Sequence, residues 1–159
     1  MKEGKRQKLG QILKLQGIIS GPKLVKALDQ QKLHGGKLGE VLVAQGLITE
    51  EQLTIALHEQ WRIPIIDFDR APFNSQAIRA LTQNYCVDHM VLPVTFIRVG
   101  GKPILVLAME NPSNHGLIEQ VHQMTNFPIK PMLAGRFRLI QAISDSYQNL
   151  KQSAQYPYV

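Results

Sequence analysis

The stretch KLGQILKLQGIISGPKLVKALDQQ, residues 8–31, is followed by KLGEVLVAQGLITEEQLTIALHEQ, residues 37–60, which repeats its pattern. Only KLHGG, residues 32–36, separates the two blocks. The shared pattern K-L-G-x-x-L-x-x-Q-G-[IL]-I-[ST]-x-x-x-L-x-x-A-L-x-x-Q therefore recurs at an offset of 29 residues. A duplicated surface suits a two-fold symmetric ligand, just as dimeric proteins suit palindromic sites.

Each block predicts a helix, a break and a second helix. Gly17 and Gly46 follow the first apolar stretch and are expected to end the first helix. Ser20 is a candidate N-cap with Pro22 in the next turn, and Thr49-Glu50-Glu51-Gln52 is a capping box. Apolar residues then recur at helical spacing. The blocks therefore predict four short helices, arranged as two αα-hairpins.

The remainder of the chain predicts a mixture of strands and helices. Gly100-Gly101 separates two apolar stretches and indicates a β-hairpin. Strands are expected at 63–68, 91–99, 103–108 and 127–133, and helices at 75–85, 116–124 and 135–150. The predicted fold class is α+β, with a helical subdomain at 1–61, a small α/β subdomain at 62–150 and a flexible tail at 151–159.

The net charge of +6 is concentrated at one end of the chain. Residues 1–37 hold nine Lys or Arg against two acids, whereas residues 38–159 hold nine against ten. This asymmetry indicates either an anionic partner or a solvated basic arm. Apolar runs are too short to span a bilayer, and the N-terminus leads into no signal-peptide core. With Cys86 as the single cysteine, we expect a cytoplasmic protein.

Motifs for catalysis are missing from the sequence. Gly100-Gly101-Lys102-Pro103 lacks the upstream glycine and the hydroxyl residue of a P-loop. The histidines have no H-x-x-x-H spacing, paired cysteines are absent, and there is no G-x-S-x-G elbow. Cys86 is interpreted as a core residue. We therefore expect neither an enzyme nor a metal site or cofactor.

The duplicated block has a structural and a ligand-binding interpretation. Helix packing and capping account for its leucines, alanines and post-helical glycines. They account less well for Gly10 and Gly39 at helix starts, where glycine costs up to about 1 kcal/mol relative to alanine. A glycine there lets a phosphate approach backbone N–H groups, with a lysine two residues earlier as its partner. The closing glutamines, Gln31 and Gln60, can read a base edge.

The pattern resembles the bipartite motif of the MshE N-terminal domain family. Domains of this family form the N-terminal part of type II secretion and type IV pilus assembly ATPases. The family motif R-L-G-x-x-[LVI]-[LVI]-x-x-G-[LVI]-[LVI]-x-x-x-x-L-x-x-x-L-x-x-Q also occurs twice with a five-residue spacer. Leu92-Pro93-Val94 and the segment 108–114 add a weaker similarity, so the resemblance extends over about residues 5–148. It implies a receptor that binds cyclic di-GMP, with one half of the ligand on each block.

The resemblance assigns eight ligand-binding residues to each block. In the first block they are Lys8, Leu9, Gly10, Gly17, Ile18, Leu24, Leu28 and Gln31. In the second block they are Lys37, Leu38, Gly39, Gly46, Leu47, Leu53, Leu57 and Gln60. Arg6 is an additional candidate for a phosphate or guanine contact.

Three departures from the family pattern bear on this assignment. Lys8 and Lys37 replace arginine, which keeps the charge but loses the planar fork for bidentate phosphate contact. Lys14 replaces an aliphatic residue. Residues 1–159 contain no ATPase domain, so we expect a signal to pass to a protein partner such as secretion or pilus machinery. Alternatively, the chain is a nucleotide-independent adaptor on that machinery. A nucleic-acid binder ranks last, because residues 1–60 have no aromatic platform.

Overall fold

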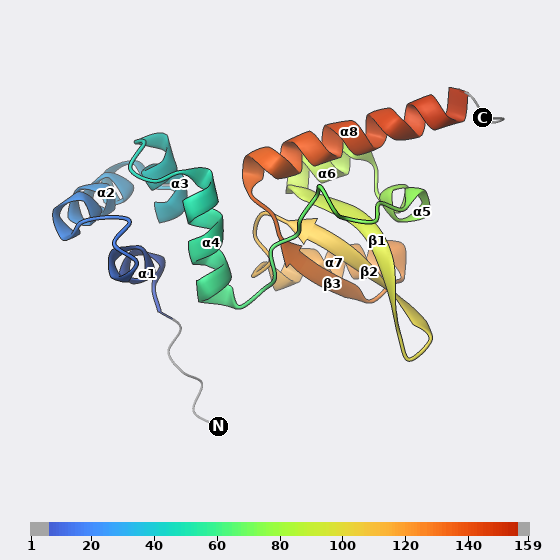
Figure 1. Ribbon diagram of the computed structural model, residues 1–159, viewed down its shortest axis with the longest axis horizontal. Helices are drawn as coiled ribbons and strands as arrows, with labels where there is room; N and C mark the ends of the chain where they lie inside the picture. The colour runs from blue at the N-terminus through green and yellow to red at the C-terminus, as the bar shows by residue number, and fades with distance from the viewer. Residues whose placement is uncertain (1–6, 156–159) are drawn as a thin grey trace. The chain divides into compact units, whose positions relative to one another are not determined.

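A computed structural model of the chain describes residues 7–155, and it divides into two compact units, Met1–Arg62 and Ile63–Val159 (Figure 1). The first unit is helical and the second combines helices with a small sheet, which confirms the α+β class. Arg6, one of the predicted ligand-binding residues, lies outside the described residues. That the two units are independent domains stays a prediction.

The described part of the first unit consists of the four predicted helices: α1 Leu9–Leu15, α2 Gly21–His34, α3 Leu38–Ala44 and α4 Glu50–Trp61. The helices of the two blocks are interleaved, because α1 packs mainly against α4 and α2 mainly against α3. Exchanging the two blocks turns the first pair into the second. The first helix of each block thus packs mainly against the second helix of the other block. This exchange gives the unit a pseudo-two-fold arrangement.

The core of the first unit follows the repeat. Leu13 and Leu42 are fully buried, and so are Ala27 and Ala56, the small residues of α2 and α4. Ile12, Ile19 and Ile48 complete the buried cluster. Burial of about 0.8 kcal/mol per methylene is the main stabilising term for such short helices. The positions common to both blocks therefore include the ones that hold the unit together.

The second unit is built on a three-stranded sheet of β1 Val91–Val99, β2 Lys102–Met109 and β3 Ile129–Leu133, in that order. Strands β1 and β2 are antiparallel, and the predicted Gly100-Gly101 hairpin is confirmed. Both glycines have positive φ angles, 56° and 78°, which the tight turn requires. Strand β3 lies parallel to β2, so helix α7 connects the two.

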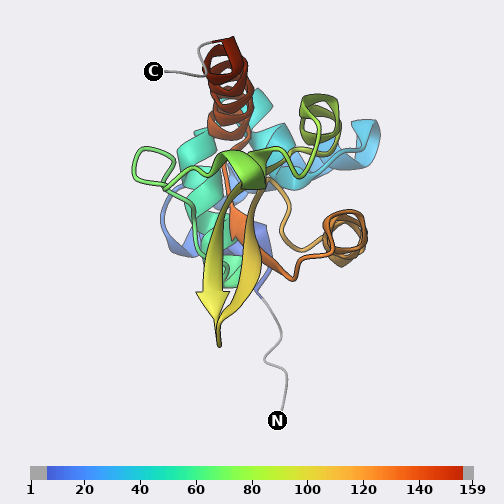
Figure 2. The same cartoon turned by 90° about the vertical axis from the view of Figure 1, so that its right-hand side faces the viewer.

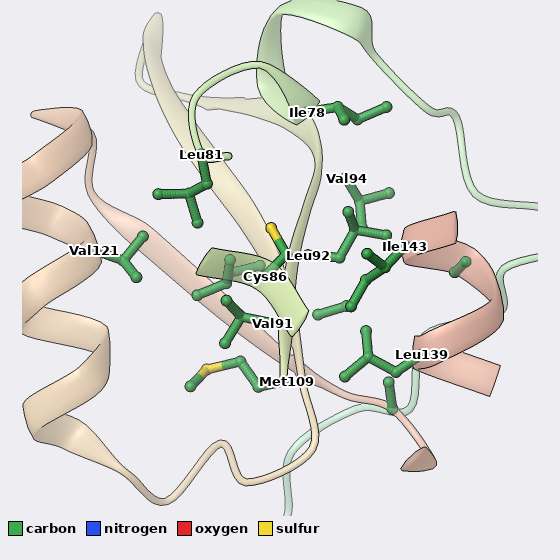
Figure 3. Close-up of a cluster of buried hydrophobic side chains, with 14 of the residues drawn as sticks. Ile78, Leu81, Cys86, Val91, Leu92, Val94, Met109, Val121, Leu139 and Ile143 are labelled. Atoms are coloured by element: carbon green, nitrogen blue, oxygen red, sulfur yellow. The ribbon is translucent and has the colours of Figure 1, made fainter. Parts of the chain in front are cut away.

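Four helices accompany the sheet: α5 Ser75–Ile78, α6 Gln83–His89, α7 His115–Thr125 and α8 Arg136–Gln155. Helices α5, α6 and α8 contact β1, whereas α7 contacts β3. Figure 2 shows α8 nearly along its axis, beside the sheet. Side chains from the strands, α7 and α8, among them Leu92, Val121 and Ile143, converge in one buried cluster (Figure 3).

Tyr147 fixes α8 against the α5–α6 connection. Its hydroxyl donates to the carbonyls of Ile78 and Leu81, at 2.9 and 2.8 Å, and lies 3.4 Å from the Cys86 sulfur. Burial raises the pKa of the Cys86 thiol to about 11, although the hydrogen bond to Tyr147 opposes this shift. Cys86 is fully buried, which confirms it as a core residue rather than an accessible thiolate.

Three predicted element boundaries are corrected by the structure. The helix expected at 75–85 is two helices, because Thr82 caps α6 by accepting from the Tyr85 N–H at 3.2 Å. The strand expected at 63–68 is reduced to a single bridge, Ile65 to Leu133, because Pro64 has no N–H to donate and the chain turns at Asp67. Helix α8 continues to Gln155, so residues 151–155 of the expected tail are helical.

Candidate functional site

The sixteen described residues of the predicted site form eight pairs at equivalent positions, and the members of each pair are buried to a similar degree. The lysines, Lys8 and Lys37, are exposed and the block-start glycines, Gly10 and Gly39, are buried. The leucines, Ile18 and the glutamines are half-buried. The structure therefore presents two matching sets of residues, each with a charged, an apolar and an amide component.

Gly17 and Gly46 are required by the helix ends that they form. Their φ angles are +71° and +66°, and each first helix closes in a Schellman motif. In the first block, Gly17 donates to the Lys14 carbonyl at 3.1 Å and Ile18 to the Leu13 carbonyl at 3.0 Å. The second block repeats both bonds with Gly46 and Leu47. Backbone geometry thus explains these two glycines without a ligand.

Gly10 and Gly39 are explained in large part by packing. A Cβ on Gly10 would lie 3.0 Å from Leu24 Cδ1, and one on Gly39 would lie 2.6 Å from Leu53 Cδ1. The leucine of the second helix thus occupies the space beside the glycine of the first helix in the same block. The proposed approach of a phosphate to these N–H groups stays a prediction.

The starts of the two blocks lie next to each other. A Cβ on Gly10 would stand 3.5 Å from Leu38 Cδ2, so the K-L-G segment of the second block reaches that of the first. Lys8 and Lys37 each precede the first turn in an extended conformation. Neither lysine forms an ion pair with another residue of the described range 7–155. Two cationic chain segments therefore flank one junction.

The closing glutamines form a reciprocal pair of hydrogen bonds. Gln60 Nε2 donates to the Gln7 carbonyl at 3.2 Å, across 53 residues of sequence, and Gln31 Nε2 donates to the Gly36 carbonyl at 3.0 Å. Gln7 and Gly36 each precede the lysine of a block. Each glutamine therefore holds the start of the other block, while its Oε1 is left as an acceptor.

This linkage was missed in the interpretation of the sequence. Residues 7 and 36 are related by the same offset of 29 as the blocks, although their side chains differ. Only the backbone carbonyl is used, so the residue type gives no signal. The one sequence signal for this linkage is position, because both carbonyls belong to the residue just before the lysine of a block.

The apolar residues of the candidate site fall into two groups. Leu9, Ile18 and Leu24, with their equivalents Leu38, Leu47 and Leu53, pack against the buried cluster of the first unit. Leu28 and Leu57 are half-buried but lie outside that cluster as it is formed by the described residues. Leu28 and Leu57 are therefore the members of the set with the least structural explanation.

One difference between the blocks concerns Lys14, whose equivalent is Val43. The Lys14 ammonium lies 3.7 Å from the position that a Cβ on Gly21 would take, so the side chain extends over the first residue of α2. Val43 instead packs against the core. The two halves of the candidate site are therefore similar in backbone but unequal in charge.

Three further features were sought among the described residues: a metal site, a membrane-spanning helix and a cavity. Within residues 7–155, no group of three or more His, Cys, Asp or Glu side chains could hold a metal ion. No helix in that range is long and apolar enough to cross a membrane. A hollow of about 410 Å³ in the second unit lies between Phe73 and α8, and none of the sixteen predicted residues lines it.

Comparison with known proteins relates this chain to the MshEN domain. The family model described as MshEN domain matches residues 61–153, mainly the second unit. Type IV pilus assembly ATPase PilB of Myxococcus xanthus (strain DK1622) is 32% identical over 143 residues, which is 88% of this chain. The chain spans only about a quarter of PilB, 24% of its length.

Two solved structures have a similar fold. The structure of MshE with its ligand cyclic di-GMP is 28% identical, has a TM-score of 0.74 and covers 89% of this chain and 100% of its own. The N-terminal domain of XpsE is 19% identical, has a TM-score of 0.69 and covers 91% of this chain and 97% of its own. The XpsE likeness carries information on the fold alone.

Proposed function

This chain belongs to the MshEN domain family, and on that basis we propose that it is a cyclic di-GMP receptor module that signals through protein contact. The ligand has two bases and two phosphates, and the two blocks offer two quasi-equivalent half-sites. The residues assigned to ligand binding are the sixteen described above together with Arg6. Each half-site combines a lysine, half-buried aliphatic side chains and a glutamine.

The observation that carries the proposal is the junction between the two block starts. Gly10 and Leu38 adjoin there, and two exchange-related glutamine bonds hold the flanking segments. A pseudo-two-fold arrangement of this kind lets one two-fold ligand touch both blocks at once. Binding would therefore stabilise the interleaved arrangement of all four helices.

The chemistry of the half-sites suits a nucleotide with limited charge. Half-buried leucines can cover a base face, and apolar burial contributes roughly 25 cal/mol per Å². Lys8 and Lys37 supply one positive charge each for the two phosphates. Because lysine lacks the planar fork of arginine, we expect weaker and less directional phosphate contact than a motif arginine would give.

The likeness to MshE supports the same ligand. It covers 89% of this chain and so must extend into the first unit, since the second unit holds residues 63–159. MshE is the relative whose structure was solved with cyclic di-GMP. The family match alone would not be sufficient, because it lies wholly outside the duplicated blocks.

Calorimetric titration of the chain with cyclic di-GMP tests the proposal. We expect binding heat and a raised melting temperature, with modest dependence on salt because the contacts are mainly apolar. Leu57→Asp should abolish binding, because it places a carboxylate among the apolar contacts. Ile55→Asp is the matched control, since Ile55 lies on the same helix but is 45% exposed and is not assigned to the ligand.

Two outcomes would overturn the assignment. Absence of both heat and melting shift at hundreds of micromolar ligand would exclude the receptor function for this chain. Equal loss of binding in Leu57→Asp and Ile55→Asp, with both variants folded, would place the ligand elsewhere. If Leu57→Asp unfolds the first unit, Leu57 is a core residue, and Leu28→Asp becomes the informative variant.

The proposal places the receptor in the cytoplasm, with a protein partner that reads the ligand-bound state. Ligand contact with both blocks would shift the population toward one relative arrangement of the helix pairs. Secretion or pilus machinery is the proposed class of partner, in keeping with the likeness to PilB. The chain itself would carry no catalysis.

A nucleotide-independent adaptor is the second candidate function. It is favoured by the finding that packing and helix ends account in large part for the four glycines of the candidate site, Gly10, Gly17, Gly39 and Gly46. Lysine in place of both motif arginines points the same way. In the Lys8→Ala/Lys37→Ala variant, a co-purified partner from the pilus machinery would then bind as before, with and without cyclic di-GMP. A nucleotide-dependent change in that binding would exclude the adaptor.

A further inference from the structure

The two blocks differ in net charge. Block 8–31 holds four lysines and one aspartate, a net charge of +3, whereas block 37–60 holds one lysine and four glutamates, a net charge of −3. The buried positions are unaffected, since Leu13 and Leu42 or Ala27 and Ala56 remain the same. The difference in net charge therefore arises outside the buried positions that the two blocks share.

Helix α2 carries the basic surface. Lys23, Lys26 and Lys32 are exposed along it, and Asp29 is its only acid. Val25 lies between Lys23 and Lys26, and Leu33 follows Lys32; they are 57% and 75% exposed. This helix thus presents cations interspersed with apolar side chains.

Helix α4 carries the acidic counterpart. Glu51, Ile55 and Glu59 are exposed at i, i+4 and i+8, which places them on one stripe of the helix. Ile55 is the apolar residue between the two acids, and it is 45% exposed. Glu59 already has Arg62 as a neighbour, at 3.6 Å, so Glu51 offers the less screened negative charge.

We infer that the outer face of α2 docks on the outer face of α4 in a second copy of this chain. Lysines of one helix meet glutamates of the other, and the exposed Leu33 covers Ile55. Every copy carries both faces, so the contact is heterologous. Such a contact produces a ring or an open array rather than a closed dimer.

The size of the contact determines how it can be detected. One pair of short helices buries less than the roughly 1,200 Å² of a standard stable interface, so the association is weak and concentration-dependent. Exposed charges act over about 10 Å at 0.1 M salt, so added salt must weaken the contact. High protein concentration and low salt are therefore the conditions for the test.

The test is sedimentation equilibrium of the full chain without nucleotide, compared among the wild type, Lys23→Glu/Lys26→Glu and Glu51→Lys/Glu59→Lys. The average mass of the wild type should rise as the protein concentration is increased to about 0.5 mM. It should fall when the salt concentration is raised about tenfold from 0.05 M. Each variant alone has two faces of one sign and should stay monomeric. An equimolar mixture of the two variants should associate as the wild type does.

Several results would overturn the inference. These are a monomeric wild type over the whole concentration range, association that is insensitive to salt, and a mixture that stays monomeric although circular dichroism shows both variants folded. Association of either variant alone at wild-type strength would also exclude it. If a variant does not fold, a wild type that stays monomeric, or that associates independently of salt, still overturns the inference.

Discussion

The first and second blocks bury a leucine at the same position of the repeat, Leu13 and Leu42. At another pair of equivalent positions, which are exposed, the first block has Lys26 and the second has Ile55. Their turns agree as well, with Gly17 and Gly46 in the same left-handed conformation. Identity is thus kept where the backbone or the core allows few alternatives. Divergence occurs where a side chain reaches solvent, which is where the two blocks can acquire different partners.

The largest effects are expected where the blocks agree most. Leu13→Ala and Leu42→Ala each remove a fully buried side chain, so each should lower the free energy of unfolding by about 2–5 kcal/mol, and by similar amounts. Urea unfolding monitored by fluorescence measures this, since Trp61 is the single tryptophan and ends α4. If only one of the two substitutions lowers the free energy of unfolding, the two blocks do not contribute equally to the core.

A smaller and unequal effect is expected at the block-start glycines. Gly39→Ala would put a methyl group 2.6 Å from Leu53, whereas Gly10→Ala would put one 3.0 Å from Leu24. We expect a cost of about 1–2 kcal/mol for Gly39→Ala and a smaller cost for Gly10→Ala. In a double-mutant cycle, Gly39→Ala should cost much less when Leu53 is already replaced by alanine. Additive costs would show that the leucine is not the obstacle.

The smallest effect separates the two second-helix caps. Thr49 accepts from the Gln52 N–H at 3.1 Å and its own N–H donates to Gln52 Oε1 at 2.9 Å, so Thr49→Ala should cost about 1 kcal/mol. Ser20 makes no side-chain cap bond to any described residue, so Ser20→Ala should be nearly neutral. The same fluorescence assay compares them. Equal costs would mean that Ser20 caps α2 in solution.

Local signals predicted the elements well. Gly17, Gly46 and Gly100-Gly101 each impose a backbone conformation, and the Thr49–Gln52 capping box formed as expected. The break before α6 was missed because Thr82 was interpreted as a helix residue rather than as an N-cap. The strand at 63–68 failed because apolar composition does not show whether a neighbouring strand continues alongside it.

The interleaving of helices could not be derived from the pattern. Helix pairs within a block and helix pairs between blocks bury the same leucines and alanines, so periodicity does not distinguish them. The bond from Gln60 to the Gln7 carbonyl depends on that choice. The candidate site could therefore be predicted as a set of residues, whereas the contact between its halves required the structure.

The interleaved pairs also set the order in which the first unit can be completed. Helix α2 finds its partner α3 within a few residues, but α1 packs against α4, the last helix of the unit. During synthesis, the contacts of α1 with α4 can therefore form only after α4 has left the ribosome, while α2 and α3 can associate earlier. We therefore expect the contacts between α1 and α4 to form last during synthesis, together with the hydrogen bond from Gln60 to the carbonyl of Gln7.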